Sequence, residues 1–243
     1  MVKVLPSRKL FKLAGLAALV LGLALGPGPA FAITQDVIWD LGCVATPACQ
    51  NTSYASPHDF SSLNPAPNYT LSTSGFDGAS TPHSLFSKFT LGDPGETGLG
   101  LLGGPNNEIG PAQHVNLVVP AAGAPGWTLS QLFHLTISSV QDPEHFSIYR
   151  DNNGIGGGGL GIGDLLFGDE TNASAQCSGT ICNYIIDMTG FSTLQILGIT
   201  DDVLIAAFTT QQTSVTEPEP ATLLLLGLGL FAASFVRRRR NVS

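Results

Sequence analysis

Basic residues are almost absent from the middle of this chain. The sequence has 243 residues with ten lysines and arginines, and eight of these ten lie within the first 12 residues or in the run 237–240. Residues 33–216 keep only Lys88 and Arg150 against sixteen acidic side chains, which gives this segment a formal net charge of −14. Such a segment repels phosphate backbones and lacks the cations that would contact them. We therefore expect no nucleic-acid partner.

The sequence also lacks the spacing of known metal or hydrolytic sites. No Gly-x-Ser-x-Gly elbow occurs, and the histidines show no His-Glu-x-x-His or similar ligand pattern. Two carboxylates on facing strands could form a glycosidase pair, but a sequence does not show which carboxylates face each other. With sixteen acids in the segment, the presence of two carboxylates is no evidence for such a pair. We expect no enzyme and no cofactor, with the histidines at the surface: His58, His83, His114, His134 and His145.

The first 32 residues have the three parts of a secretory signal peptide. A basic start precedes an apolar core at 13–25, and Ala30-Phe31-Ala32 then supplies an Ala-x-Ala cleavage site. An N-terminal membrane anchor is the alternative, but the apolar core is short and a cleavage site follows it. We expect a signal peptidase to release a mature chain that begins at Ile33.

Four cysteines form two local pairs, Cys43 with Cys49 and Cys177 with Cys182. An exported chain enters an oxidising compartment, where such pairs form disulfides. The alternative of a metal site is weaker, because neither pair has the two-residue spacing of zinc knuckles and no histidine is interleaved. Two short-loop disulfides are therefore predicted.

Period-two alternation of apolar and polar residues recurs through the mature segment, and no convincing 3.6-residue apolar stripe occurs there. The alternation is clearest in 127–140, where Phe133, Leu135 and Ile137 share one face. The segment 92–110 carries seven glycines, a density that no helix tolerates. We predict an all-β fold, a single β-sandwich or jelly roll of roughly eight to ten strands over residues 33–208. Strands are expected near 35–41, 69–72, 84–91, 115–119, 127–140, 146–150, 182–188, 193–199 and 202–209.

Oxygen-bearing side chains surround the glycines of 154–163. Asp151, Asn153 and Asp164 are of the type that calcium prefers, because it takes six to eight oxygen ligands from loops. No EF-hand or tandem glycine-aspartate repeat is present. Solvated turn residues are the default interpretation, and a structural calcium ion is the alternative.

The tail of the chain has four successive parts. Residues 209–217 are polar and are expected to be a flexible linker. Pro218-Glu219-Pro220 cannot continue a strand or helix, because proline has no N–H to donate. Residues 221–236 carry no charge and as a helix would span about 24 Å, near the minimum for crossing a bilayer. Four arginines then follow, Arg237, Arg238, Arg239 and Arg240.

This order of parts resembles the PEP-CTERM sorting signal of Gram-negative bacteria, although an ordinary C-terminal anchor has similar hydropathy. The resemblance covers residues 217–240. It implies an exported protein that an exosortase, an integral-membrane cysteine protease, cleaves near Pro218-Glu219-Pro220. The ectodomains of such proteins also contain short sequence motifs similar to Asn107-Glu108-Ile109 and Asp201-Asp202-Val203-Leu204. The family is associated with exopolysaccharide and biofilm, which implies a final place at the cell surface or outside the cell.

Two non-catalytic functions remain from the sequence. The first is a structural or interaction protein of the envelope or extracellular matrix. The second is a carbohydrate-binding module for exopolysaccharide, in which aromatic side chains stack on sugar rings. An exposed, coplanar aromatic pair would favour the second, and buried aromatics would favour the first. The stacking candidates are Trp127, Tyr54, Tyr69, Tyr149 and Tyr184. Trp39 and Trp127 stand at strand starts, so both tryptophans are expected in the core.

Overall fold

The computed structural model of this chain describes residues 31–63, 68–78, 81–120, 125–152, 161, 163–200 and 202–216. The chain divides into two compact units, Thr34–Thr213 and a unit of Met1–Ile33 with Ser214–Ser243. Helical structure in the described residues is limited to three 3-10 turns: η1 (Pro47–Cys49), η2 (Pro94–Glu96) and η3 (Pro105–Asn107). The described residues contain no helix that is long and apolar enough to cross a membrane. The predicted signal peptide up to residue 30 and the predicted spanning segment 221–236 lie outside the described residues.

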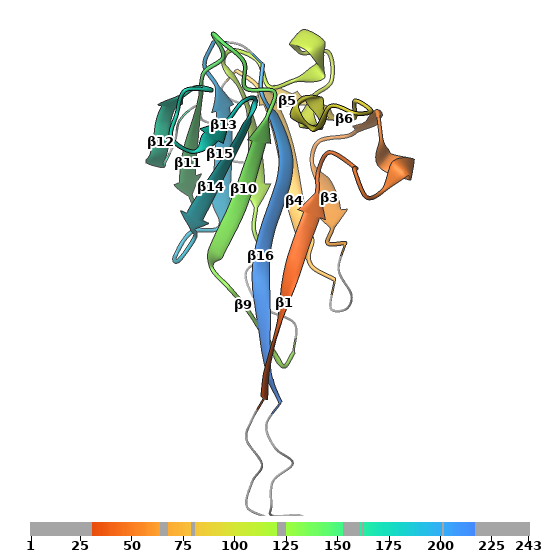
Figure 1. The fold of residues 1–243 in the computed structure, drawn as a ribbon, viewed down its shortest axis with the longest axis vertical. Helices are drawn as coiled ribbons and strands as arrows, with labels where there is room; N and C mark the ends of the chain where they lie inside the picture. Colours follow the sequence, from red (N-terminus) through yellow and green to blue (C-terminus); the bar gives the residue numbers. More distant parts are fainter. Residues whose placement is uncertain are drawn as a thin grey trace, which may run out of the picture. The chain divides into compact units, whose positions relative to one another are not determined.

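The first sheet has nine strands, in the order β13-β14-β10-β16-β7-β6-β2, and β1 and β9 also pair with β16. β16 therefore lies at its centre and joins the N-terminal strand to the rest of the sheet (Figure 1). Its strands are β1 (Phe31–Asp40), β2 (Thr52–Tyr54), β6 (Leu85–Lys88), β7 (Gly98–Leu101), β9 (Trp127–Leu129), β10 (Leu132–Ser138), β13 (Cys177–Ser178), β14 (Ile181–Asp187) and β16 (Leu204–Thr216).

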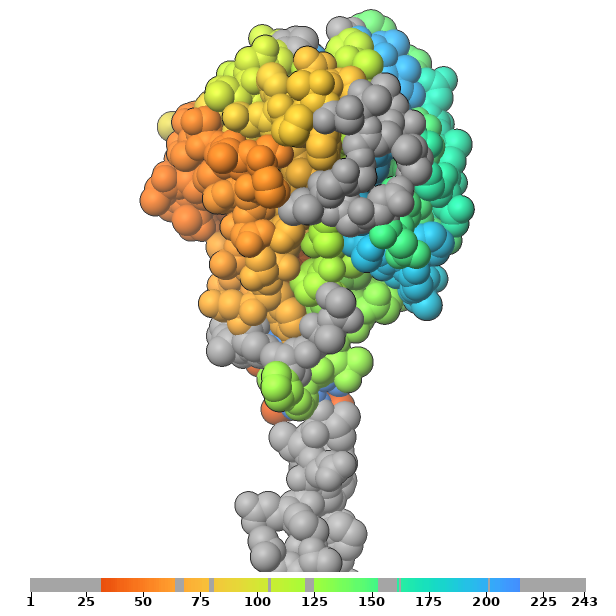
Figure 2. All heavy atoms as spheres, turned by 180° about the vertical axis from the view of Figure 1, so that it is seen from behind, coloured from red at the N-terminus to blue at the C-terminus, as the bar shows by residue number. Residues whose placement is uncertain are grey.

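The second sheet has seven strands, in the order β12-β11-β15-β8-β4-β3, with β5 on β4. Figure 2 views the molecule from behind, with the orange-to-yellow early strands on one side and the teal-to-blue late strands on the other. The strands are β3 (His58–Ser61), β4 (Thr70–Asp77), β5 (Thr81–His83), β8 (Gln113–Val118), β11 (Phe146–Asp151), β12 (Asp164–Glu170) and β15 (Thr193–Gly198).

A single apolar core joins the two sheets. In the first sheet, Phe133, Leu135 and Ile137 of β10 lie opposite Ile186, Tyr184 and Cys182 of β14, and all six are buried. In the second sheet, Val115 and Leu117 of β8 lie opposite Ile196 and Leu194 of β15, also buried. These side chains belong to one cluster. The predicted all-β, sandwich-like fold is confirmed.

The number and bounds of the strands differ from the prediction. The structure has sixteen strands in the described residues, and the predicted strand 127–140 is divided into β9 and β10. The glycine-rich segment contains β7, because Leu99 and Leu101 enter the core while Gly98 and Gly100 permit close packing. A Cβ added at Gly98 would lie 2.7 Å from Leu204 Cβ.

The predicted linker at 209–217 is wrong for residues 209–216, because they form the second half of β16. This segment contains threonine, glutamine, serine and one valine, and residues of that kind also suit a strand whose partners satisfy them. Thr209 pairs with His134 of β10, and β16 also pairs with β1 and β9. Pro218-Glu219-Pro220 and Arg237–Arg240 lie outside the described residues.

Candidate functional site

The predicted processing sites border the two terminal strands. Of the expected signal-cleavage residues, Ala32 and Ile33 lie in β1, and Ala30 lies outside the described residues. At the other end, β16 ends at Thr216, two positions before Pro218. The fold therefore brings the expected mature N-terminus and the strand that leads to the sorting motif into one pair of strands.

Polar side chains connect β1 and β16. Gln212 Nε2 donates to Gln35 Oε1 at 2.9 Å, and Gln211 Nε2 donates to Asp36 Oδ1 at 3.1 Å. Residue numbers rise on one strand as they fall on the other, which indicates antiparallel pairing. On the second sheet's side, Tyr69 Oη donates to Gln212 Oε1 at 2.7 Å. Both ends of the buried Gln212 amide are thus bonded.

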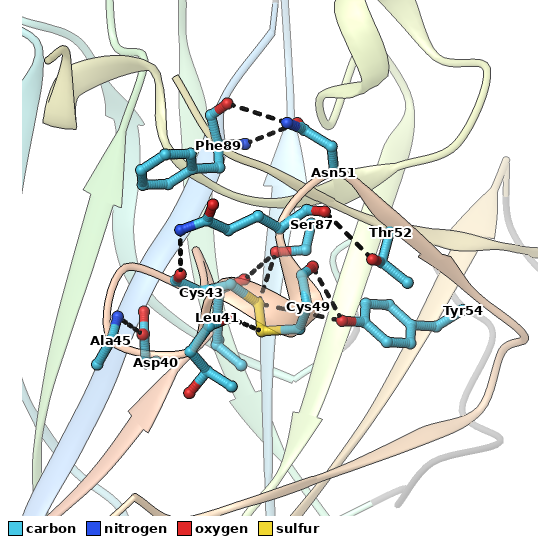
Figure 3. The surroundings of a disulfide bond; sticks show 12 residues. Asp40, Leu41, Cys43, Ala45, Cys49, Asn51, Thr52, Tyr54, Ser87 and Phe89 are labelled. Atoms are coloured by element: carbon cyan, nitrogen blue, oxygen red, sulfur yellow. Dashed lines mark hydrogen bonds between the residues drawn. A yellow bond between two sulfur atoms is a disulfide. The ribbon is translucent and has the colours of Figure 1, made fainter. Parts of the chain in front are cut away.

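The predicted disulfide Cys43–Cys49 is present and closes the loop that follows β1. Figure 3 shows its surroundings, in which Ser87 Oγ donates to Leu41 O at 3.0 Å and Tyr54 Oη donates to Cys49 O at 3.3 Å. These contacts connect the loop to β6 and β2. Closure of so short a loop stabilises the fold by about 2 kcal/mol, by restricting the unfolded chain.

The second predicted disulfide, Cys177–Cys182, is also present. The two cysteines lie opposite each other in the β13–β14 hairpin, and Cys182 is fully buried. This bridge holds the two-residue edge strand β13 on β14. Both disulfides are therefore structural links, and no cysteine of the chain is free.

The two basic side chains of residues 33–216, Lys88 and Arg150, both contact other groups of the same chain. Lys88 pairs with Glu96 at 2.9 Å and with the buried Glu108. Arg150 lies 4.2 Å from the centre of the Phe191 ring, with its Nε 3.9 Å from Asp164 Oδ2. The side chains of Lys88 and Arg150 are 20% and 22% exposed. Neither cation is available as an extended anchor for an anionic polymer.

Sequence reasoning missed the group of carboxylates around Lys88, because its members come from separate loops. Burial raises the pKa of Glu108, and Lys88 offsets this only in part. Burial also acts on Glu96, but Lys88 outweighs it and lowers that pKa. Burial, with the negative charges of Glu108, Asp202 and Glu96, raises the pKa of Glu144 to about 7. The group can therefore hold a proton near neutral pH.

Two of the three predicted calcium ligands lie in the described residues, and they are not gathered there into a metal site. Asp164 begins β12 opposite Arg150, and Asp151 ends β11, while Asn153 lies outside the described residues. Within the described part of the chain, no three acidic, histidine or cysteine side chains are placed to hold a metal ion. The proposal of a calcium ion therefore gains no support from the described residues.

Half of the tryptophans and tyrosines are buried, and the other half are half-buried. Trp39, Tyr69 and Tyr184 are buried, and Trp39 Nε1 donates to Tyr69 O at 3.1 Å. Trp127 and Tyr149 are half-buried, so the expectation that both tryptophans lie in the core is met fully only by Trp39. The half-buried Tyr54 ring stacks on His58, 4.3 Å between centroids. None of the six tryptophans and tyrosines, all in the described residues, is classed as exposed.

The expectation of surface histidines is wrong for His114. His134 is exposed as expected, whereas His114 is fully buried on β8 and stacks on Phe76 with ring centroids 4.8 Å apart. Neither ring nitrogen of His114 has a hydrogen-bond partner, and burial lowers its pKa to about 4. The ring is therefore neutral at physiological pH.

A polar row on the second sheet was also missed from the sequence. Tyr149, Gln195, Asn116 and Ser74 lie opposite one another across β11, β15, β8 and β4. Gln195 Nε2 donates to Asn116 Oδ1 at 3.2 Å, and Gly161 N donates to Gln195 Oε1 at 2.8 Å. Ser74, Asn116 and Gln195 are nevertheless buried. The row therefore serves internal hydrogen bonding.

A comparison with curated protein sequences gives no significant match. Among solved structures, the chain is similar to the K1 cleaved adhesin domain of Lys-gingipain from Porphyromonas gingivalis W83, with 12% identity over 76% of this chain and 99% of that one. The TM-score is 0.28, and a similarity at that level carries no argument about fold or function.

A comparison with protein families matches residues 218–240 to the PEP-CTERM protein-sorting motif. The match includes Pro218, Glu219 and Pro220 and all four arginines from Arg237 to Arg240. The chain thus carries the PEP-CTERM protein-sorting motif, which supports export and sorting by an exosortase.

Proposed function

We propose that this chain is a non-catalytic protein of the cell envelope or extracellular matrix, held in the membrane by its C-terminal segment until an exosortase cuts near Pro218-Glu219-Pro220. The match of residues 218–240 to the sorting motif carries this proposal. The product would be the disulfide-linked sandwich, released to the cell surface or beyond.

The chemistry of the sandwich supports a role outside the cell. Two disulfides suit an oxidising compartment. The acidic excess favours solubility and disfavours contact with polyanions, since Lys88 and Arg150 are both engaged inside the molecule. A matrix partner of this domain is therefore neutral or cationic, and an exopolysaccharide of that charge fits.

The carbohydrate-binding module gains less support. Stacking on a sugar needs an open aromatic face. Of the candidates, Tyr69 and Tyr184 are buried, and Tyr54, Trp127 and Tyr149 are half-buried. We therefore propose only the structural role.

The sorting step is tested by variants of the motif expressed in the native host. Pro218→Ala with Pro220→Ala is expected to keep the protein in the membrane fraction at full length. The matched control is Pro125→Ala, a surface position distant in sequence from the motif, which is expected to be processed as the wild type is. Equal release of the motif variant and the wild type would contradict the proposal.

A further inference from the structure

The sheet continues almost to the sorting motif. β16 ends at Thr216, so only Glu217 stands between the last strand residue and Pro218. A protease binds its substrate as an extended segment on both sides of the scissile bond, and it makes hydrogen bonds to that segment's backbone. Residues whose backbone already pairs with a neighbouring strand cannot enter such a cleft. The domain and the exosortase therefore compete for the same residues.

The competition has a defined boundary at Gln212. Gln212 is buried, with a relative exposure of 1%. Thr213 and Ser214, which follow it, are half-buried. The side-chain amide of Gln212 makes two hydrogen bonds, one from Tyr69 Oη at 2.7 Å and one to Gln35 Oε1 at 2.9 Å. Strand ends open locally at low cost where few side chains are buried. Opening from the C-terminal end would therefore stop at Gln212.

We propose that the folded domain controls its own processing: residues 213–216 must separate from β1 and from any pairing with β9 before the exosortase can cut, and Gln212, held by Tyr69 and Gln35, sets how far this opening extends. This inference rests on the proposed exosortase processing. It makes Gln212, Tyr69 and Gln35 positioning residues, which act on the reaction through the strand and do not contact the reacting atoms. The N-terminal strand thereby regulates the release of the C-terminal end.

A spacer tests the competition directly. A Gly/Ser segment of about eight residues, inserted between Thr216 and Glu217, gives the protease an unpaired approach of roughly 25 Å. Processing in the native host is followed by pulse labelling, with intact mass identifying the cut. The spacer is expected to speed processing several-fold. Unchanged processing rates would overturn the inference.

The boundary is tested with neighbouring glutamines. Gln212→Ala removes both side-chain hydrogen bonds of Gln212 and is expected to speed processing about fivefold, since cleavage through a transiently open state follows the population of that state. Gln211→Ala is the matched control, because Gln211 is exposed and makes one side-chain bond to Asp36. Equal rates for the two variants would overturn the role of Gln212.

A cross-link supplies the opposite perturbation. The contacts of Gln35 with Gln212 and Asp36 with Gln211, continued by one residue, pair Thr34 with Thr213. Thr34→Cys with Thr213→Cys is expected to slow processing severalfold when oxidised, and either single variant serves as control. In the chain with the spacer, the same cross-link should have no effect. An oxidised, spacer-free chain processed at the wild-type rate would contradict the inference.

These outcomes are distinct from failure of the proposed function. If the wild-type chain is never cut near Pro218–Pro220, the proposed processing fails and the inference fails with it. If the wild type is cut but neither spacer nor cross-link alters the rate, the processing stands and only the control by β1 is lost. Should Gln212→Ala fail to accumulate as a folded protein, the spacer and the cross-link still decide the question.

Discussion

The two ends of β16 are held by different interactions. Near its start, Leu204, Ile205 and Phe208 are fully buried, and Phe208 stacks on Phe133 with ring centroids 4.8 Å apart. Near its end, the contacts are hydrogen bonds of polar side chains, such as those of Gln212 with Tyr69 and Gln35. The first end contributes to the core of the sandwich, and the second end leads to the sorting motif.

Electrostatics adds to the difference. The loop before β16 brings Asp202 to the group of Glu96, Glu108 and Glu144 around Lys88, whereas residues 209–216 carry no charge. Burial of apolar area stabilises more per residue than a net hydrogen bond does. One strand can therefore be fixed at one end and able to open at the other, which suits the processing proposed above.

The largest effect should come from the buried end. Phe208→Ala is expected to lower the free energy of unfolding by about 3 to 5 kcal/mol, because it empties a packed site beside Phe133 and Trp39. Thr209→Ala, on the next and half-buried residue, is the control and should change it by less than about 0.5 kcal/mol. Denaturant titration of the disulfide-intact protein measures both, and similar values would refute the distinction between core and edge.

A slightly smaller loss is expected at the carboxylate group. Lys88→Met leaves the buried Glu108 without its counter-charge, at a cost of about 3 kcal/mol. Lys88→Met with Glu108→Gln should recover most of that loss, because the unpaired charge is removed as well. A double variant no more stable than the single one would show that Lys88 acts through packing instead.

The polar end should respond more weakly. Gln212→Ala is expected to cost about 1 to 2 kcal/mol, since it removes the hydrogen bonds of this side chain with Tyr69 Oη and Gln35 Oε1. Its effect on amide exchange should be confined to residues 209–216 and their partners in β1. Exchange that rises equally at both ends of β16 would indicate that the strand opens as one unit.

The last expected effect is a pH dependence of stability, which arises at the carboxylates around Lys88 and at His114. The pKa of Glu144 is raised from 4.5 to about 7, so the folded state binds more protons and stability falls as pH rises from about 4.5 to about 7. Glu144→Gln should flatten this slope, and amides near Gln212 should not follow it. A slope that survives in Glu144→Gln would assign it to another group.

His114 gives the opposite slope. Its pKa is lowered from 6.5 to about 4, so the unfolded state binds more protons and stability falls as pH drops from about 6.5 toward 4. His114→Phe keeps a ring that can stack on Phe76 and removes the titrating group. Comparing the Glu144 and His114 variants shows which residue causes the loss of stability as the pH rises and which causes the loss as the pH falls.

The sequence predicted best the features whose partners are local or periodic. The alternation of Phe133, Leu135 and Ile137 faces one core, and it appears directly in the structure of β10. Each disulfide joins cysteines five or six residues apart, so spacing and export together were sufficient. The sorting motif is a linear signal and was equally readable.

Features that depend on distant partners were not predictable. Residues 209–216 resemble a linker because their polar side chains find partners far away, such as Tyr69, which is 143 positions from Gln212. The burial of His114 could not be predicted from an alternating pattern, because both faces of β8 are covered and its polar residues are buried along with its apolar ones. Lys88, Glu96 and Glu108 meet only because β6, β7 and the loop after β7 fold together.

The most direct test of the account is the intact mass of the protein from its native host, measured separately in membrane and extracellular fractions. The account predicts an extracellular species that begins at Ile33, ends between Pro218 and Pro220, and contains both disulfides. A protein found only in membranes and still carrying Arg237–Arg240 would contradict it, because the tail would then act as a permanent anchor.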